Sequence, residues 1–166
     1  MKKKDHLNKT LVEKILDKHR ITYDSLEFAT EEEHHVAQLD LAKITIEPEN
    51  IYKTLALTGN KTGPVIAVIP LTHVVDYKKL AHISGNKKVG MIPLKDLEKT
   101  TGYIHGANTP IGIHETHSYP IFIADLAQKK EKIIVSAGKV GRSVGISPLD
   151  LEKLVQGTFA DISSEK

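Results

Sequence analysis

A single lysine, Lys53, lies within an apolar run of strand-forming residues that spans positions 51–57. Alternate side chains of a strand face the same way, so Lys53 would share a face with Ile51, Leu55 and Leu57. An ammonium group among aliphatic side chains either reaches solvent at the rim of a sheet or lies in a partly desolvated site. Lys53 is therefore open to two interpretations, a solvated strand lysine or a cation that awaits an anionic ligand.

Two glycine-containing segments follow, Gly-Ala-Asn-Thr-Pro-Ile-Gly at 106–112 and Ser-Ala-Gly-Lys-Val-Gly-Arg-Ser at 136–143. Glycine lets the main chain approach a ligand closely, and successive N–H groups form a nest that accepts anions. Such donors can hold a terminal ribose and phosphate, or polarise an ester carbonyl as an oxyanion hole does. We expect the two segments to be neighbouring loops around one cleft. The alternative for each is a structural turn.

Other phosphate and nucleophile motifs fit poorly. Residues 59–62, Gly-Asn-Lys-Thr, resemble the end of a P-loop, but the upstream glycine is absent, and the chain has no Gly-x-Gly-x-x-Gly. A Ser-His-Asp site at Ser136 would need a Gly-x-Ser-x-Gly elbow, and Val135 precedes the serine instead.

The chain has nine histidines, among them the pairs His34-His35 and His114-x-x-His117. No His-Glu-x-x-His pattern or matching carboxylate cluster accompanies them, so we interpret them as surface residues and expect no metal site.

Composition limits the class of protein. At 166 residues, 40% hydrophobic and 27% charged, the chain is expected to form one globular domain over residues 1–166. The absence of cysteine excludes disulfides and thiolate nucleophiles. No apolar run is long enough to span a membrane and no secretory signal opens the chain, so we expect a cytoplasmic protein. A net charge of +2 predicts that any contact with nucleic acid is small or shared with a partner.

The elements that must position these residues follow from periodicity and end signals. Helices are expected over 8–19, about 36–44, 76–84, 93–100 and 148–155, with one helical turn at Pro48 and a hairpin connection at 60–63. Strands are expected over 21–28, 51–57, 64–69, 89–92, 111–113, 120–124, 132–136 and 144–146. This order predicts an α+β fold, a mixed and mostly antiparallel sheet or open barrel with helices outside.

Several short motifs occur together in one order: Tyr-Lys-Thr-Leu at 52–55, Thr-Gly-Tyr at 101–103 before the segment 106–112, Ser-Ala-Gly-Lys at 136–139 with Gly141, and Phe-Ala-Asp-Ile at 159–162. Over nearly its full length the chain resembles the YbaK-type aminoacyl-tRNA deacylases, which are related to the editing insertion domain of bacterial prolyl-tRNA synthetases. The resemblance implies removal of mischarged cysteine from tRNA(Pro), and also from tRNA(Cys), without a metal or cofactor.

The resemblance also implies roles for particular residues. The catalytic set would be Lys53, Gly106, Ser136 and Gly138, with Lys53 at the 3′-terminal adenosine or its phosphate. The substrate-binding set would be Phe28, Thr109, Pro110 and Ser143. Chemistry would be substrate-assisted, with the cysteine thiol attacking its own ester while the enzyme positions it and stabilises the oxyanion. The 3′ CCA end of a mischarged tRNA, and prolyl-tRNA synthetase, would be the partners.

Two departures from the family pattern bear on specificity. Ser143 stands where the pattern has Asp, after Val140 in place of Arg, and Gly-Ala-Asn-Thr-Pro at 106–110 replaces Gly-Gly-Ile-Ser-Pro. Alanine or another small amino acid therefore remains an alternative substrate. A non-catalytic module that binds aminoacyl-tRNA or a nucleotide, and a metal-dependent hydrolase that uses the histidines, are the alternatives of other classes. The sequence leaves the oligomeric state open.

Overall fold

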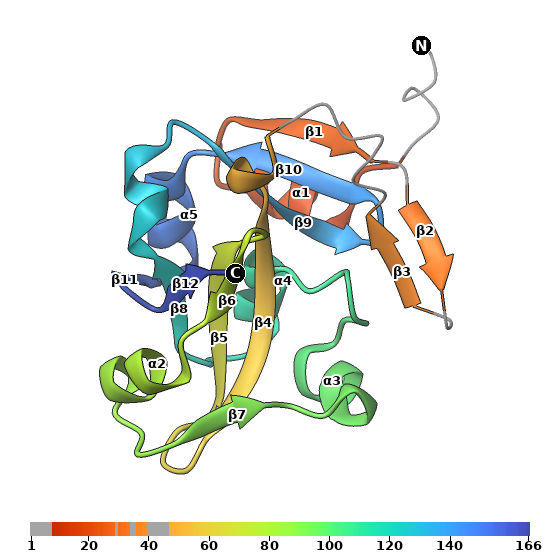
Figure 1. The fold of residues 1–166 in the computed structure, drawn as a ribbon. Coiled ribbons are helices and arrows are strands. Elements are labelled where there is room, and N and C mark those ends of the chain that lie inside the picture. Colours follow the sequence, from red (N-terminus) through yellow and green to blue (C-terminus); the bar gives the residue numbers. More distant parts are fainter. Residues whose placement is uncertain (1–7, 29, 34–35, 40–46) are drawn as a thin grey trace.

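The computed structural model describes residues 8–28, 30–33, 36–39 and 47–166 (Figure 1). Its helices are α1 (Leu11–Lys18), α2 (Tyr77–Ser84), α3 (Leu94–Thr101), α4 (Pro110–Thr116) and α5 (Pro148–Val155), with the short 3-10 helices η3 (Pro48–Asn50) and η4 (Asp125–Lys129). Its strands are β1 (Tyr23–Glu27), β2 (Thr30–Glu33), β3 (Val36–Leu39), β4 (Tyr52–Gly59), β5 (Gly63–Pro70), β6 (His73–Val75), β7 (Val89–Met91), β8 (Ile121–Ala124), β9 (Ile133–Lys139), β10 (Arg142–Ile146), β11 (Thr158–Ala160) and β12 (Ser163–Glu165).

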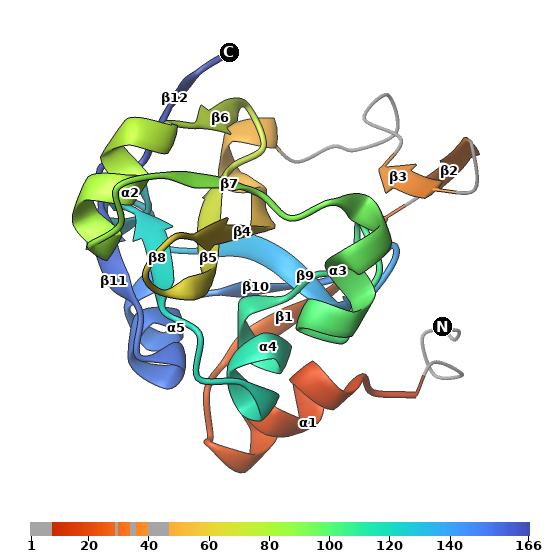
Figure 2. The same cartoon turned by 90° about the horizontal axis from the view of Figure 1, so that it is seen from below.

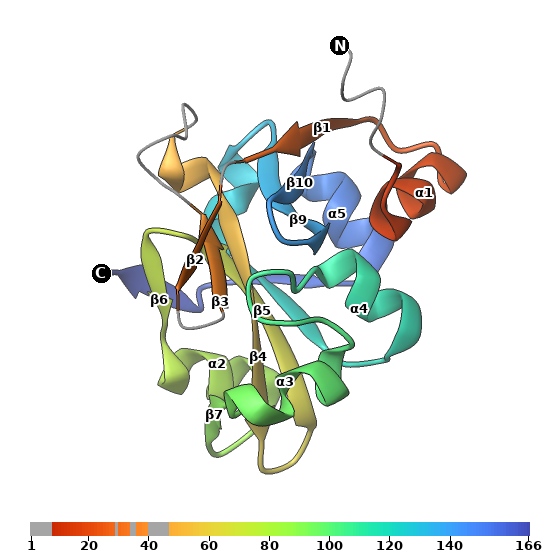
Figure 3. The ribbon, with the colours of Figure 1, turned by 90° about the vertical axis from the view of Figure 1, so that its right-hand side faces the viewer.

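The strands form one five-stranded sheet, ordered β11-β8-β5-β4-β7, and one three-stranded sheet, ordered β1-β10-β9. Strand β8 runs parallel to both β5 and β11, and the remaining pairs are antiparallel. A single parallel bridge between Ile51 and Ile134 brings the start of β4 beside β9 (Figure 3). This arrangement confirms the α+β fold with a mixed, mostly antiparallel sheet.

Helices cover the sheets on two sides. Figure 2 shows α1, α4 and α5 on one side of the molecule and α2, β6 and β7 on the other. Between them lies an aliphatic core whose largest fully buried members are Leu16, Leu57, Ile66, Ile69, Leu80, Ile111, Ile113, Ile123, Ile133, Ile146, Leu151 and Ile162. None of the described helices combines the length and the apolar character needed to cross a membrane.

Local end signals fix several helices as the sequence predicts. In α1, Glu13 N–H donates to Thr10 Oγ1 at 3.2 Å and Thr10 N–H donates to Glu13 Oε1 at 2.8 Å, which completes a capping box. Helix α2 ends at Gly85 in the left-handed conformation, and Ser147 caps the start of α5. The one-turn helix at Pro48 is η3, and the hairpin at 60–63 joins β4 to β5.

The strand predicted over 111–113 is wrong, because these residues belong to helix α4. Alternation of Ile111 and Ile113 around a glycine looks like a strand. Pro110, however, occupies the first position of the helix, where its missing N–H costs nothing, whereas in a strand it would remove a ladder donor. Both isoleucines are buried, on a helix whose short apolar stretch faces the core.

The helix predicted over 36–44 is also wrong over the described part of that range. Residues 36–39 form β3, which pairs antiparallel with β2 from Thr30↔Leu39 to Glu33↔Val36. The helix prediction used Val36, Leu39 and Ile44, whose spacing is a weak helical signal, and backbone pairing with a neighbouring segment overrides it. Ile44 lies outside the described residues.

Candidate active site

Lys53 lies in β4, antiparallel to Ile69 of β5, and its side chain is half-buried. Ile51 and Leu57 on the same face are buried and Leu55 is half-buried, so the lysine is surrounded by aliphatic neighbours as the alternation predicts. Burial, with a smaller contribution from the positive charge of Lys166, lowers the pKa of Lys53 from its ordinary value. Within the described part of the chain Lys53 forms no ion pair. Lys53 is therefore a half-buried cation without an ion-pair partner among the described residues.

Ser136 joins β9 to the loop between α3 and α4. Its hydroxyl donates to the Ala107 carbonyl at 3.1 Å and accepts from the Gly138 N–H at 3.1 Å. We call the place where residues 102–109 meet β9 the loop junction. The hydroxyl of Ser136 thus holds this junction together. The two glycine-containing segments are therefore neighbours, as expected. They are not two loops, however, because residues 136–139 and 142–143 belong to β9 and β10 and residues 110–112 belong to α4.

Gly138 lies at the centre of the loop junction. Its φ of +94° is in the left-handed region, and a Cβ there would lie 3.1 Å from Tyr103 Cε1 and 3.7 Å from Thr109 Cγ2. Tyr103 also closes over Gly112 of α4, where its phenol ring leaves no room for a side chain. Burial first, and then the Glu115 carboxylate, raise the pKa of Tyr103. The ring of Tyr103 therefore forms one wall of the junction.

The loop itself is held from within. Thr101, which is fully buried, donates its hydroxyl to Asn108 Oδ1 at 2.8 Å and accepts from the Tyr103 N–H at 3.1 Å. Gly106 lies in this loop with a φ of +90°. It precedes Ala107, whose carbonyl accepts the hydrogen bond from Ser136. The bonds of Thr101 connect the start of the loop to its far end at Asn108.

Thr109 and Pro110 start α4. Thr109 is the N-cap residue, yet its hydroxyl makes no capping bond and is buried without a hydrogen-bond partner among the described residues. Its methyl group instead packs toward Gly138. Pro110 is buried at the first helical position. The structure thus brings Thr109 to the loop junction through an apolar contact, and Pro110 follows it in the chain.

Ser143 and Phe28 lie on the other side of β9. Ser143 of β10 is directly opposite Ser136, next to an irregularity in the pairing of β9 and β10. The Phe28 N–H donates to the Gly141 carbonyl at 2.8 Å, which ties the end of β1 to the β9–β10 turn. Ser143 is therefore adjacent to the junction, and Phe28 adjoins the turn that follows it.

Lys53 reaches the same region from the other sheet. The bridge between Ile51 and Ile134 aligns β4 with β9, and Lys53 and Ser136 each lie two residues beyond the bridged pair. Because the two strands run parallel at this point, the two residues are at the same level of the fold. Six of the candidates thus lie on β9, on its neighbour β10 or on the segment 106–110 beside β9. Phe28 adjoins the β9–β10 turn, and Lys53 lies on β4, without a direct hydrogen bond to the loop junction among the described contacts.

A buried ion pair supports the junction from beneath. Arg142 Nη2 lies 3.1 Å from Glu13 Oε1, and their side chains are only 15% and 3% exposed. Glu13 also accepts from the Ser25 hydroxyl and from the Thr10 N–H. This carboxylate thereby connects α1, β1 and the β9–β10 hairpin, the hairpin that carries Gly138 and Ser143.

Sequence reasoning did not assign Tyr103, Glu13, Arg142 or Lys166 to the site. Tyr103 belongs to the Thr-Gly-Tyr motif, which was a usable signal for its position at the junction. Glu13 had only a helix-start signal, the Thr10-Leu-Val-Glu13 pattern of a capping box. Lys166 had no signal, because its approach to Lys53 depends on the pairing of β12 with β6.

Two of the described histidines have side-chain contacts: His73 Nδ1 lies 2.9 Å from Ser163 Oγ, and His117 contacts its sequence neighbours. His117 Nδ1 lies 2.8 Å from Thr116 Oγ1, and its ring stacks on Tyr119 at 4.6 Å between centroids. Across residues 8–28, 30–33, 36–39 and 47–166 no three His, Asp or Glu side chains gather in a way that could hold a metal ion.

The family model for the aminoacyl-tRNA editing domain matches residues 30–154, which include Lys53, the loop junction and Ser143. The chain belongs to the aminoacyl-tRNA editing domain family.

One curated member of this editing family is similar along its whole length. It is a protein of Enterococcus faecalis named as the Cys-tRNA(Pro)/Cys-tRNA(Cys) deacylase EbsC, 45% identical over 166 residues, with 100% of each chain covered.

Solved structures show the same editing-domain fold at lower identity. One, described as a trans-editing enzyme for prolyl-tRNA synthetase, has a TM-score of 0.74 at 17% identity, over 92% of this chain and 94% of that chain. Another, described only as a hypothetical protein, has a TM-score of 0.79 at 19% identity, over 92% and 99%. At these identities the likeness establishes the fold.

Proposed function

We propose that this editing-domain protein is a free-standing deacylase that removes cysteine from mischarged tRNA(Pro), and from tRNA(Cys). Membership of the editing family and full-length similarity to EbsC support this activity. In the structure, the observation that carries it is Lys53, a half-buried cation without an ion-pair partner among the described residues. A partly desolvated ammonium group gains more from a phosphate than a fully hydrated one, because less water must be removed.

Lys53 would hold the phosphate or ribose of the terminal adenosine, and the loop junction would receive the ester. Backbone N–H groups of the loop at Gly106 would polarise the carbonyl, and Gly138 would let the substrate approach the main chain. Ser136 would position the loop, because its hydroxyl already makes two hydrogen bonds. Tyr103 and Thr109 would limit the space for the amino-acid side chain.

The proposed reaction needs no nucleophile from the protein. The cysteine sulfur forms a bond to its own carbonyl carbon, and the bond from that carbon to the tRNA 3′ oxygen breaks. The thiol proton passes to the leaving 3′ hydroxyl, and water later opens the cyclic thioester. The enzyme contributes position and stabilisation of the oxyanion. An alanyl ester has no thiol, so it cannot react in this way.

The test is deacylation of Cys-tRNA(Pro) and Ala-tRNA(Pro) by the wild type, Lys53→Ala and, as a matched control, Lys153→Ala on exposed α5. We expect the wild type to release cysteine rapidly, with or without a chelator. Lys53→Ala, but not Lys153→Ala, should lower kcat/KM roughly 10²-fold, which corresponds to a loss of about 3 kcal/mol of transition-state stabilisation. Faster release of alanine than of cysteine would make Ala-tRNA(Pro) the substrate instead. Tight binding of aminoacyl-tRNA without ester loss would identify a binding module and sink the proposal.

The choice of tRNA would come partly from an associated prolyl-tRNA synthetase. If the deacylase contacts the substrate mainly at its terminal adenosine, it cannot distinguish one tRNA body from another, because this adenosine is common to all tRNAs. In the same assay we expect the isolated protein to deacylate Cys-tRNA(Pro) and Cys-tRNA(Cys) at similar rates, and added synthetase to favour tRNA(Pro). Strong discrimination by the isolated protein would contradict this.

A further inference from the structure

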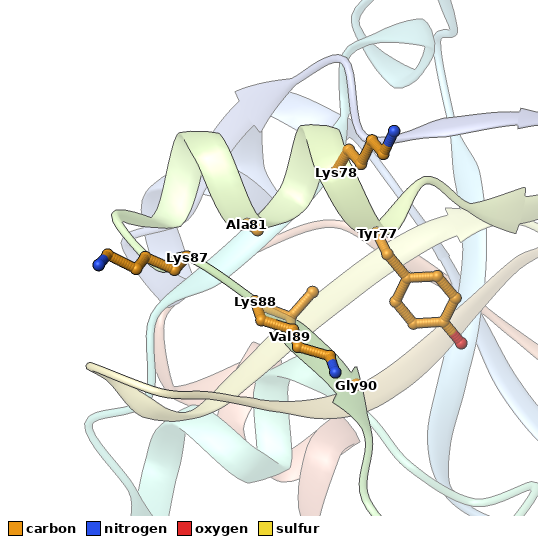
Figure 4. A pocket seen from close by; sticks show the side chains of 7 residues that line it. All are labelled: Tyr77, Lys78, Ala81, Lys87, Lys88, Val89 and Gly90. Atoms are coloured by element: carbon orange, nitrogen blue, oxygen red, sulfur yellow. The ribbon is translucent and has the colours of Figure 1, made fainter.

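A groove of about 350 Å³ lies between α2 and β7, away from the loop junction (Figure 4). Its lining residues are Tyr77, Lys78, Ala81, Lys87, Lys88, Val89 and Gly90. Ala81 and Val89 are buried and supply an apolar floor, whereas the lysines are exposed and Tyr77 is 46% exposed. None of these lining residues is acidic, so the groove is one-sidedly basic in a chain whose net charge is only +2.

The three lysines are free to meet an external anion. Within the described part of the chain, Lys78, Lys87 and Lys88 form no ion pair, whereas the adjacent Lys79 is paired with Asp161 at 2.8 Å. Figure 4 shows the ammonium groups of Lys78 and Lys87 pointing away from one another, with Lys88 extending along β7 toward Gly90. Cations that spread apart suit a row of phosphates better than one isolated anion.

The backbone beneath Lys87 and Lys88 is rigidly held. Asn60 Oδ1, from the turn between β4 and β5, accepts from the Lys87 and Lys88 N–H groups at 2.8 and 3.0 Å. Asn86, which is buried, accepts from the Lys61 N–H at 2.8 Å. The two lysines therefore extend from a fixed base, which lowers the entropy lost when they bind.

The groove is also at a suitable distance from Lys53. Strand β4 links the two places, because Thr58 pairs with Gly90 and Gly59 with Val89. Six residues separate Lys53 from Gly59, which corresponds to about 20 Å along the strand. A contact at that distance lies beyond the aminoacyl end itself, on the sugar–phosphate chain that leads to the acceptor stem.

We infer that this groove binds the sugar–phosphate backbone of the tRNA acceptor stem while the aminoacyl end lies at Lys53. The inference rests on the proposed function and adds a second, sequence-independent contact to it. Lys78, Lys87 and Lys88 contact successive phosphates, and the exposed Tyr77 ring packs against a sugar or an unpaired base. RNA is favoured over an acidic protein partner, because the substrate of the same enzyme is a polyanion whose charges are regularly spaced.

The experiment compares the wild type with a groove variant, Lys78→Gln, Lys87→Gln and Lys88→Gln combined. The matched control combines Lys14→Gln, Lys18→Gln and Lys153→Gln, three exposed lysines of α1 and α5 on the opposite side (Figure 2). Each protein is assayed on Cys-tRNA(Pro) and on a cysteinyl CCA trinucleotide, which reaches only the Lys53 end. Binding of uncharged tRNA is measured separately over a series of salt concentrations.

For the groove variant we expect KM for Cys-tRNA(Pro) to rise roughly tenfold with kcat unchanged, and log Kd for uncharged tRNA to lose about 2–3 units of slope against log salt. Trinucleotide turnover and the control should match the wild type. A groove variant that binds uncharged tRNA with the control's affinity and slope would overturn the inference. Loss of synthetase binding with tRNA binding intact would assign the groove to a protein instead.

The two proposals fail differently. If the wild type releases cysteine from neither substrate, the proposed function is wrong, and tRNA binding by the groove variant still decides the inference. If the wild type is active, and the groove variant equals the control in KM and in tRNA binding, the proposed function stands and only the assignment of the groove is wrong.

Discussion

Thr109 has a buried hydroxyl with no hydrogen-bond partner among the described residues, beside Gly138 and the ring of Tyr103. A buried hydroxyl without a partner reduces stability, since it has lost its water. At a substrate site the same group can be an unused contact for the ligand. The methyl group of Thr109, in contrast, is already used in packing toward Gly138.

Two substitutions separate these roles of Thr109. Thr109→Val keeps the methyl group and removes the hydroxyl, and we expect unfolding in urea to give equal or higher stability. Thr109→Ser keeps the hydroxyl and leaves a small cavity, and we expect a loss of about 1 kcal/mol. If the hydroxyl contacts the substrate, KM rises in the valine variant and stays near the wild-type value in the serine variant. The reverse pattern would limit Thr109 to packing.

At the scale of elements, helix α1 and the β9–β10 hairpin are joined through Glu13. The carboxylate accepts from Thr10 of its own helix, from Ser25 of β1 and from Arg142 of β10. Val12 of α1 also lies within 3.8 Å of the place a Cβ on Gly138 would occupy. The position of the catalytic candidates on the hairpin thus depends on a helix that contributes no catalytic side chain.

We expect Glu13→Ala to lower the free energy of unfolding by about 2–4 kcal/mol, because it leaves the Arg142 guanidinium buried without its partner. Urea unfolding followed by circular dichroism measures this. Lys132→Gln is the control, since it breaks the exposed pair with Asp24 (48% and 56% exposed) and should change stability by only a few tenths of a kcal/mol. Equal effects of the two substitutions would show that the buried pair has no special importance.

At the scale of the whole molecule, the last strand brings a second cation toward Lys53. Strand β12 pairs with β6, and the Lys166 N–H donates to the Thr72 carbonyl at 3.2 Å. The neighbouring Leu71 N–H donates to the Ile51 carbonyl at 2.7 Å, just before Lys53. Chain segments far apart in sequence therefore set the electrostatics of one side chain.

This arrangement predicts a pH dependence. The pKa of Lys53 is below its ordinary value of 10.5, so its charge, and the anion binding it supports, is lost as pH rises through that lowered pKa. Lys166→Gln removes one of the two causes, and we expect the loss of binding to move to higher pH. The measurement is the Kd of a non-hydrolysable 3′-amide analogue of aminoacyl-tRNA between neutral pH and about pH 10. An unchanged midpoint would mean that burial alone sets the pKa.

The effect of pH on stability has the opposite sign to its effect on binding. A lysine whose pKa is lowered on folding destabilises the folded state while it is charged, and this penalty is relieved as pH rises through the lowered pKa. The half-buried Lys53 therefore lowers the free energy of unfolding while it is charged. Such a loss of stability is common at residues that serve binding rather than packing.

Sequence alone determined what depends on neighbours along the chain. The capping box of α1, the Ser147 cap of α5, the hairpin between β4 and β5 and the alternation around Lys53 are all local, and their signals lie within a few residues. The family motifs indicated the editing family and the residues grouped around β9. The functional roles of those residues, and the single domain over 1–166, stay predictions.

Tertiary structure decided what depends on contacts between distant segments. It made α4 a helix where Ile111 and Ile113 suggested a strand, and it paired β11 and β12, each only three residues long, with β8 and β6. It placed Arg142 against Glu13, Lys166 near Lys53, and three lysines around one groove. Short strands and isolated charges carry almost no local signal, because their free energy comes from partners that only the fold brings together.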